Sequence, residues 1–247
     1  MFLFQNRFRV CDLFDIPVYV NMSFLVLLGL FVVDFGSFSF GLACALVLAI
    51  SVTAHELAHA LMARAFGYRT KDITLSLLGG CASLIALPRK AWQEFLVALA
   101  GPVMSFLLAF AVVLLDVFEI PVRNRFLAYV LNYSCWMNFM LGAFNLLPGF
   151  PMDGGRVFRS AMCLFTTRAK ATRVAMWVGR VFAILLALRG LSAMFSGGGF
   201  GFISILIAWM IWQEGWREYQ MALAEEAFRD WTQDDFNARV SPPPYDR

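Results

Sequence analysis

The chain has 247 residues, of which 60% are hydrophobic and 15% are charged, and its formal net charge is +3. Soluble domains are typically about 45–50% apolar and about 25% charged, so this composition excludes a soluble globular enzyme, a disordered regulator and a collagen-like fibre. The five cysteines are scattered and form no C-x-x-C pair, which argues against a disulfide framework or a thiolate metal site. The composition is that of a polytopic membrane protein.

Long charge-free runs predict about six transmembrane helices, because a spanning helix needs roughly 20 mostly apolar residues. Five clear runs and one that Arg180 interrupts lie, in chain order, at 16–33, 35–54, 95–115, 126–152, 174–188 and 190–213. The expected fold class is therefore an all-α polytopic membrane protein. We expect residues 1–219 to form a transmembrane core and residues 220–247 to form a short cytoplasmic tail.

Two connections differ from ordinary loops. Segment 72–88 carries Gly79-Gly80 between two short apolar runs that partly alternate, which predicts a membrane-associated β-hairpin between the second and third helices. Segment 196–201 is rich in glycine and predicts a hinge between the last two spans. Its composition is equally well explained by a short, exposed loop.

The positive charges predict the orientation in the membrane. If the N-terminus is cytoplasmic and there are six spans, sixteen of the twenty Lys and Arg residues fall on the cytoplasmic side. Only three fall on the opposite side, and this asymmetry is typical of the positive-inside rule. An even number of spans then places both termini in the cytoplasm.

The only two histidines, His55 and His59, stand in one H-E-x-x-H motif, HELAH, at residues 55–59. On a helix this spacing places two imidazoles on one face, one turn apart, where they can share a zinc ion. Glu56 beside the first histidine can then act as a general base. The motif closes a long apolar run, and ionisable groups in such a position usually serve a function.

The third metal ligand should be a carboxylate, because the chain has no third histidine and its cysteines are scattered. Asp153 follows the apolar run 126–152 and, by the predicted topology, lies on the same side of the membrane as the histidines. Two alternatives stay open for Asp153: it could cap the next helix, or it could pair with Arg156.

Four features together resemble the site-2 protease family of intramembrane zinc metalloproteases. They are HELAH, the Gly-Gly hairpin after it, Ala100-Gly101-Pro102, and the segment that begins N-x-x-P at residue 145 and continues to P-M-D-G-G-R at 151–156. The resemblance covers roughly residues 18–219, which is nearly the whole chain.

The resemblance implies a site with one Zn²⁺ per chain. His55, His59 and Asp153 correspond to the zinc ligands, Glu56 to the catalytic glutamate, and Asn145 to the asparagine of the N-x-x-P element. Asn145 could donate a hydrogen bond to the carbonyl oxygen under attack or hold the substrate backbone. The alternative is that it only ties down the unwound helix end near the following proline.

The implied activity is regulated hydrolysis of a peptide bond within or near the transmembrane segment of a single-span membrane protein. The implied partners are the lipid bilayer and an upstream site-1 protease that acts on the same substrate, with no nucleic acid. We expect a multi-pass protein of a prokaryotic inner membrane. Two other functions stay open: a zinc-binding scaffold or chaperone without proteolytic activity, and a channel or transporter. The channel is disfavoured because the polar residues cluster in two short motifs.

Overall fold

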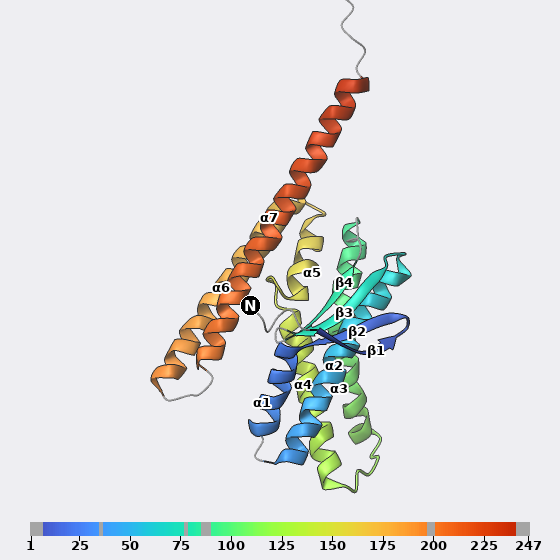
Figure 1. Cartoon of the computed structure of the whole chain (residues 1–247), viewed down its shortest axis with the longest axis vertical. Helices are drawn as coiled ribbons and strands as arrows, with labels where there is room; N and C mark the ends of the chain where they lie inside the picture. Colours follow the sequence, from blue (N-terminus) through green and yellow to red (C-terminus); the bar gives the residue numbers. More distant parts are fainter. Residues whose placement is uncertain (1–6, 35–36, 77–78, 85–89, 197–200, 241–247) are drawn as a thin grey trace, which may run out of the picture. The chain divides into compact units, whose positions relative to one another are not determined.

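The computed structural model describes residues 7–34, 37–76, 79–84, 90–196 and 201–240. The chain divides into two compact units, Met1–Leu147 and Pro148–Arg247 (Figure 1). The described residues of the first unit form four strands and four helices. They are β1 (Arg7–Leu13), β2 (Ile16–Asn21), α1 (Met22–Asp34), α2 (Phe38–Ala65), β3 (Thr70–Ser76), β4 (Gly79–Leu84), α3 (Ala91–Val117) and α4 (Arg125–Asn145).

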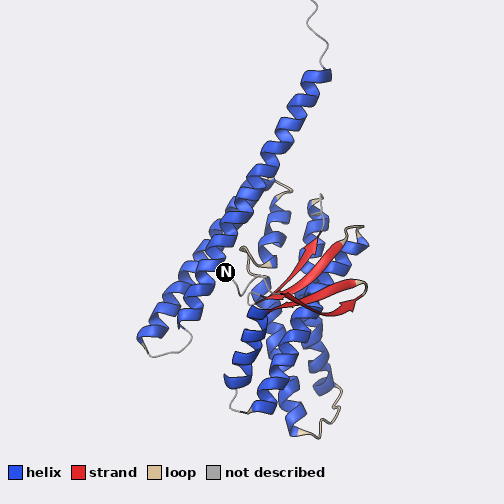
Figure 2. Ribbon diagram, viewed as in Figure 1, coloured by secondary structure: helices blue, strands red, loops and turns tan. Residues whose placement is uncertain are grey.

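The four strands form one sheet in the order β1-β2-β3-β4, which lies across the helices of the first unit (Figure 2). β1 and β2 are antiparallel, β3 and β4 are antiparallel, and β2 and β3 pair in parallel. The predicted hairpin is confirmed as β3 and β4. Its two glycines do not form the turn, however. They begin β4, and residues 77–78 lie outside the described residues.

The core of the first unit joins the sheet to α1 and α2. Ile16 and Val18 of β2 and Ile73 and Leu75 of β3 point to one side of the sheet, as the alternation of side chains along a strand requires. They pack with three residues of the helices: Phe24, Val52 and Ala60. Since α2 contributes residues on both sides of the HELAH motif to this core, the sheet fixes the position of the motif.

The second unit consists of α5 (Asp153–Met162), α6 (Arg168–Phe195) and α7 (Gly201–Val240). The side chain of Thr167 caps α6 by accepting a hydrogen bond from the backbone N–H of Lys170. α6 and α7 lie side by side and pack closely: a Cβ at Gly190 would stand 2.7 Å from the carbonyl oxygen of Gly201 (Figure 1). α7 continues without a break past the expected boundary at residues 219 and 220.

The first of the six expected spans is wrong. The run 16–33 combines strand β2 with helix α1, and α1 has only 13 residues. At 1.5 Å per residue such a helix is about 20 Å long, whereas the hydrocarbon core is about 30 Å thick.

The last two expected spans are also divided differently. Run 174–188 belongs to the longer α6, and run 190–213 includes the end of α6 and the start of α7. In the expected hinge, Ser196 caps α6 and Gly201 begins α7, while residues 197–200 lie outside the described residues.

Three helices of the described chain are long and apolar enough to cross a membrane: α2, α3 and α6. Six spans are therefore not confirmed. In each of these three helices no more than 33% of the most apolar stretch is buried within the protein. The remaining apolar side chains, such as Phe110 of α3 and Leu185 of α6, are exposed. An exposed apolar surface of this extent is suited to contact with lipid.

Candidate metal centre

The HELAH motif lies in the last three turns of α2, and its three polar side chains are buried. The exposed fractions are 2% for His55 and 9% each for Glu56 and His59. Because the histidines are four residues apart on one helix, their rings are neighbours, with centroids 4.9 Å apart. The predicted arrangement of the two imidazoles on one helix face is therefore present.

Helix α3 orients both imidazole rings through their Nδ1 atoms. The Nδ1 of His59 lies 2.6 Å from the carbonyl oxygen of Val97, to which it must donate, and the Nδ1 of His55 lies 2.8 Å from the hydroxyl of Ser105. In each ring the Nε2 atom is consequently the one available as a metal ligand. Histidine ligands in metal sites are usually held in this way, with the other ring nitrogen bonded to a carbonyl, carboxylate or water.

The two Nε2 atoms face the same point on α3, the backbone of Gly101. A Cβ atom placed on Gly101 would lie 2.6 Å from Nε2 of His55 and would overlap Nε2 of His59. Only glycine lets the helix backbone approach both nitrogens so closely. This explains in physical terms why a glycine stands in Ala100-Gly101-Pro102.

Strand β4 covers the carboxyl group of Glu56. A Cβ atom on Gly80 would stand 2.7 Å from Cδ and 2.8 Å from Oε1 of Glu56. The Gly-Gly pair, which the sequence places in a hairpin turn, instead allows the strand to lie against the glutamate. The glutamate therefore lies against the backbone of a strand, one residue after His55 on the same helix.

Asn145 is the last residue of α4, and its side chain is half-buried. Its Nδ2 donates a hydrogen bond to the carbonyl oxygen of Leu141, at 2.9 Å. This bond supports the alternative in which Asn145 stabilises the helix end, and it leaves the second amide hydrogen for another acceptor.

Asp153 is the first residue of α5 in the second unit, and its side chain is half-buried. A carboxylate at this position is stabilised by the helix dipole. The backbone of Gly155 packs against that of Gly149, since a Cβ on Gly155 would lie 2.7 Å from the carbonyl carbon of Gly149. The two glycines after Asp153 therefore allow the chain to fold back tightly at the start of α5.

Sequence reasoning missed Ser105 and Val97 as partners of the histidines. Ser105 is four residues after Gly101, on the same face of α3, and it is completely buried. A serine in the middle of an apolar span, one turn from the A-G-P segment, is the signal that could have identified it. The carbonyl of Val97 has no sequence signal, because every residue carries one.

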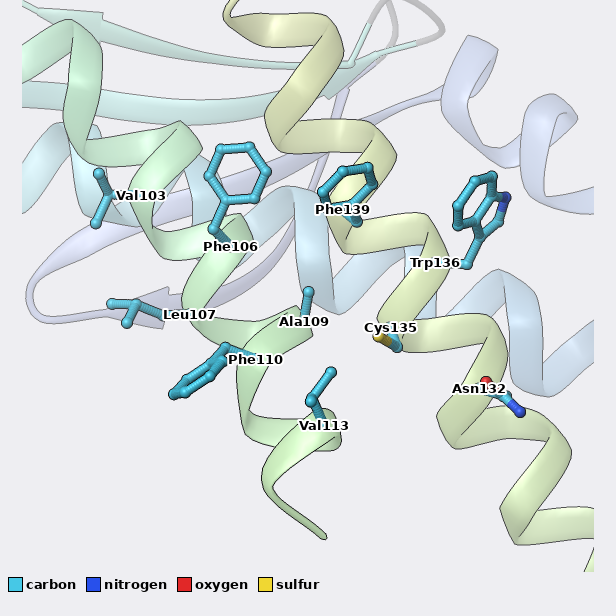
Figure 3. Close-up of a pocket in the computed structure, with 10 residues that line it drawn as sticks. All are labelled: Val103, Phe106, Leu107, Ala109, Phe110, Val113, Asn132, Cys135, Trp136 and Phe139. Carbon is cyan, nitrogen blue, oxygen red and sulfur yellow. The ribbon is translucent and has the colours of Figure 1, made fainter. Parts of the chain in front are cut away.

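A cavity of about 700 Å³ lies between α3 and α4. Figure 3 shows four aromatic side chains among its lining residues, Phe106 and Phe110 on α3 and Trp136 and Phe139 on α4. No histidine or carboxylate is among its lining residues. Its lining is mostly apolar, so this cavity is suited to apolar chains.

Comparison with known proteins agrees with this geometry. The sequence matches peptidase family M50 over residues 43–125 and 116–188. It is 35% identical over 249 residues to a putative zinc metalloprotease of Synechocystis sp., with 94% of this chain and 64% of that protein covered. It is 29% identical over 227 residues to a zinc metalloprotease of Methanocaldococcus jannaschii, with 90% of this chain and 63% of that protein covered.

The chain thus spans slightly less than two thirds of the length of these curated relatives. Among solved structures, the site-2 protease from Methanocaldococcus jannaschii is similar, with a TM-score of 0.65 and 28% identity, covering 87% of this chain and 95% of that one. With its three long apolar helices the protein is an integral membrane protein. The chain belongs to peptidase family M50, the site-2 protease family.

Proposed function

We propose that the protein is an intramembrane zinc metalloprotease that hydrolyses a peptide bond within or near a transmembrane segment of a membrane-protein substrate. One observation carries the proposal: Nε2 of His55 and Nε2 of His59 face one point beside Gly101, next to a buried glutamate. Buried imidazole pairs held through their other nitrogens are typical of metal sites.

The donor set fits zinc, with one ion per chain. We propose His55, His59 and Asp153 as ligands; they offer two ring nitrogens and one carboxylate oxygen. Two histidines and one carboxylate, with a fourth position left open, form a common ligand set for catalytic zinc. When bound, zinc supplies a Lewis acid that polarises the scissile carbonyl and lowers the pKa of water.

The protein's own groups move the proton and orient the peptide. Glu56 takes the proton of the hydrolytic water and passes it to the leaving amine. Since Gly80 packs against its carboxyl group, the side chain has little freedom to turn away. Asn145 has a second amide hydrogen that can donate to the substrate carbonyl or its backbone, whereas its bond to Leu141 fixes the end of α4.

The substrate must be unwound for cleavage, because helix carbonyls are shielded by their own hydrogen bonds. We propose that the unwound segment adds to β4, which lies at an edge of the sheet, beside Glu56. β3 cannot serve in this way, since it pairs with β2 on one side and with β4 on the other. The alternative role for the hairpin is to plug the site.

Proline substitutions in β4 distinguish these two roles. Adjacent residues of a strand direct their N–H groups to opposite edges. The variants Cys81→Pro and Ala82→Pro therefore differ: one loses a hydrogen bond to β3, and the other loses an N–H donor on the open edge of β4. Strand addition predicts that the open-edge variant keeps its thermal stability but loses cleavage. Cleavage at the wild-type rate in that variant would exclude strand addition at β4.

The predicted environment is also part of this proposal. We propose a prokaryotic inner membrane with both termini in the cytoplasm, a transmembrane core over residues 1–219 and a tail over residues 220–247. We also propose that the substrate has a single transmembrane span and that a site-1 protease cleaves it first. The distribution of Lys and Arg supports the orientation, and reporter fusions at each terminus test it.

The decisive experiment compares wild-type protein with Glu56→Gln and Glu119→Gln in proteoliposomes that contain a single-span substrate. We expect Glu56→Gln to retain zinc and lose cleavage, because the amide cannot accept the proton. Glu119→Gln, in the loop after α3, should cleave at the wild-type rate. A Glu56→Gln protein that still supports the wild-type phenotype in cells would favour the non-proteolytic scaffold.

A further inference from the structure

Arg180 stands in the middle of α6 and is surrounded by tryptophans. Its Cζ lies 4.9 Å from the ring centroid of Trp177 on the same helix. On α7 it lies 4.4 Å from the centroid of Trp212 and 5.5 Å from that of Trp216. Aromatic faces at these distances stabilise a guanidinium by cation–π attraction. They do not satisfy its N–H groups, which lie in the plane of the guanidinium.

No described side chain or carbonyl completes the hydrogen bonding of Arg180. Its Nε is buried and has no hydrogen-bond partner, and no described carboxylate pairs with it. A charged group in an apolar segment is costly unless it is paired, and such groups commonly mark binding sites. The residue therefore presents strong hydrogen-bond donors that the protein itself does not use.

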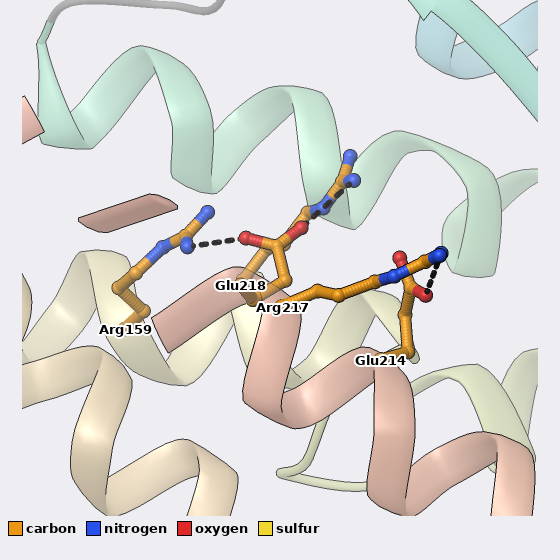
Figure 4. Close-up of polar contacts among 5 residues, drawn as sticks. Arg159, Glu214, Arg217 and Glu218 are labelled. Atoms are coloured by element: carbon orange, nitrogen blue, oxygen red, sulfur yellow. Dashed lines mark hydrogen bonds and ion pairs between the residues drawn. The ribbon is translucent and has the colours of Figure 1, made fainter. Parts of the chain in front are cut away.

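The glutamates of α7 that are nearest in sequence to Trp212 and Trp216 form ion pairs with other arginines. Glu218 accepts from Arg159 at 2.9 Å (Figure 4) and lies 3.7 Å from Arg156. Glu214 pairs with Arg217 at 3.4 Å (Figure 4). These ion pairs account for both carboxylates, so neither of them compensates the charge of Arg180.

On α7 the two tryptophans lie where the apolar part of the helix meets its charged part, and on α6 Trp177 and Arg180 lie within seven residues of the last cation of the charged N-terminal part. On α6, Arg173 precedes Arg180 by seven residues, about 10 Å along the axis, and lies on the same face. On α7, Trp216 is followed directly by Arg217. Tryptophan concentrates at the level of lipid headgroups, and the exposed fractions of 52% for Trp177 and 43% for Trp216 place them at the surface.

We propose that Arg180, held between Trp177, Trp212 and Trp216, binds the phosphate of an anionic phospholipid at the membrane interface. The guanidinium fork matches two phosphate oxygens, and charge-assisted bonds of this kind are about twice as strong as neutral ones. Arg173 adds a second positive charge further from the membrane centre, towards the headgroup. The exposed apolar side chains beyond Arg180 on α6, such as Val181 and Leu185, then contact the acyl chains.

Native mass spectrometry of the full chain in detergent tests this proposal without any use of catalytic activity. Phosphatidylglycerol and phosphatidylcholine with identical acyl chains are titrated against wild type, Arg180→Gln, Arg180→Lys and Arg189→Gln. Arg189 is the matched control, since it is an exposed arginine on the same helix. Wild type and Arg189→Gln should bind the first phosphatidylglycerol about tenfold more tightly than phosphatidylcholine.

Arg180→Gln should remove this preference. Arg180→Lys should retain only part of it, because lysine keeps the charge and lacks the planar fork. The proposal is overturned if Arg180→Gln keeps the full preference. It is overturned also if inorganic phosphate displaces phosphatidylglycerol equally for long and short acyl chains, which would indicate a site for free phosphate. Loss of binding to an acidic peptide in Arg180→Gln, with lipid binding unchanged, would assign the site to a substrate carboxylate.

Discussion

Replacing Gly101 by alanine tests the geometry of the metal centre most directly. The added Cβ would stand 2.6 Å from Nε2 of His55, and ordinary contacts begin at 3.4 Å, so the ring or α3 must move by about 0.8 Å. The second ring, that of His59, must move further. Ligand distances in a metal site tolerate changes of only about 0.2 Å.

The expected result is a selective loss of metal. Weakening of groups that only orient the ligands reduces metal affinity by about 10–100-fold, so displacement of both ligands should reduce zinc affinity by at least about 100-fold. Overpacking costs about 1–3 kcal/mol. Alanine has a higher helix propensity than glycine, which stabilises the folded variant by up to about 1 kcal/mol. The fold should therefore survive, with a modestly lower Tm.

The assay is zinc content by atomic emission, together with competition against a chelator and a thermal unfolding curve. Gly29→Ala is the matched control, because Gly29 is also in a helix of the first unit and a Cβ there would meet nothing within 4 Å. The control should bind zinc like the wild type. Wild-type zinc affinity in Gly101→Ala would show that the two Nε2 atoms do not hold the metal, and the reasoning would be refuted.

Three further variants test neighbouring parts of the structure. Ser105→Ala removes the partner of His55 and should lower zinc affinity about 10–100-fold in chelator competition; an unchanged affinity would show that this hydrogen bond does not orient the ligand. Asp153→Ala should abolish both zinc retention and cleavage, whereas Asp116→Ala should affect neither, and the reverse pattern would contradict the proposed ligand set. Arg159→Met leaves the carboxylate of a largely buried ion pair without its closest partner and should destabilise the protein by about 3–5 kcal/mol in chemical denaturation. Arg217→Met, in an exposed pair, should cost at most about 1 kcal/mol, and equal losses in the two variants would exclude a special role for the buried pair.

The metal-binding motif and the long helices could be predicted from the sequence, because each depends on residues that are close together in the chain. The HELAH motif indicates a metal site within five residues, and continuous apolar runs predict α2 and α3. The hairpin was equally visible, since its two strands are adjacent in the chain. These predictions depend on periodicity and spacing, which a single sequence contains.

The parts that the sequence did not reveal depend on contacts between distant residues. The run 16–33 carries no charge, so a search for long charge-free runs joins the strand to the helix across residues 21 and 22. The alternating β-branched residues of 16–20 and the polar pair Asn21 and Ser23 were the hints, and Asn21 Oδ1 accepts a hydrogen bond from the backbone N–H of Ser23. The partner of β2 is β3, more than fifty residues later, and the hydroxyl bonded to His55 is fifty residues away. No local pattern specifies such pairs.

The parallel pairing of β2 with β3 fixes the inner strand of the hairpin against the core. Val18 pairs with Ile73 and Val20 with Leu75, and both strands are anchored in the core by buried side chains. β3 could move away from α2 only by breaking its backbone hydrogen bonds to β2 and exposing that core. In the proposed strand addition, β4 would therefore align an extended peptide from a fixed neighbour, to which it is joined by its own pairing with β3.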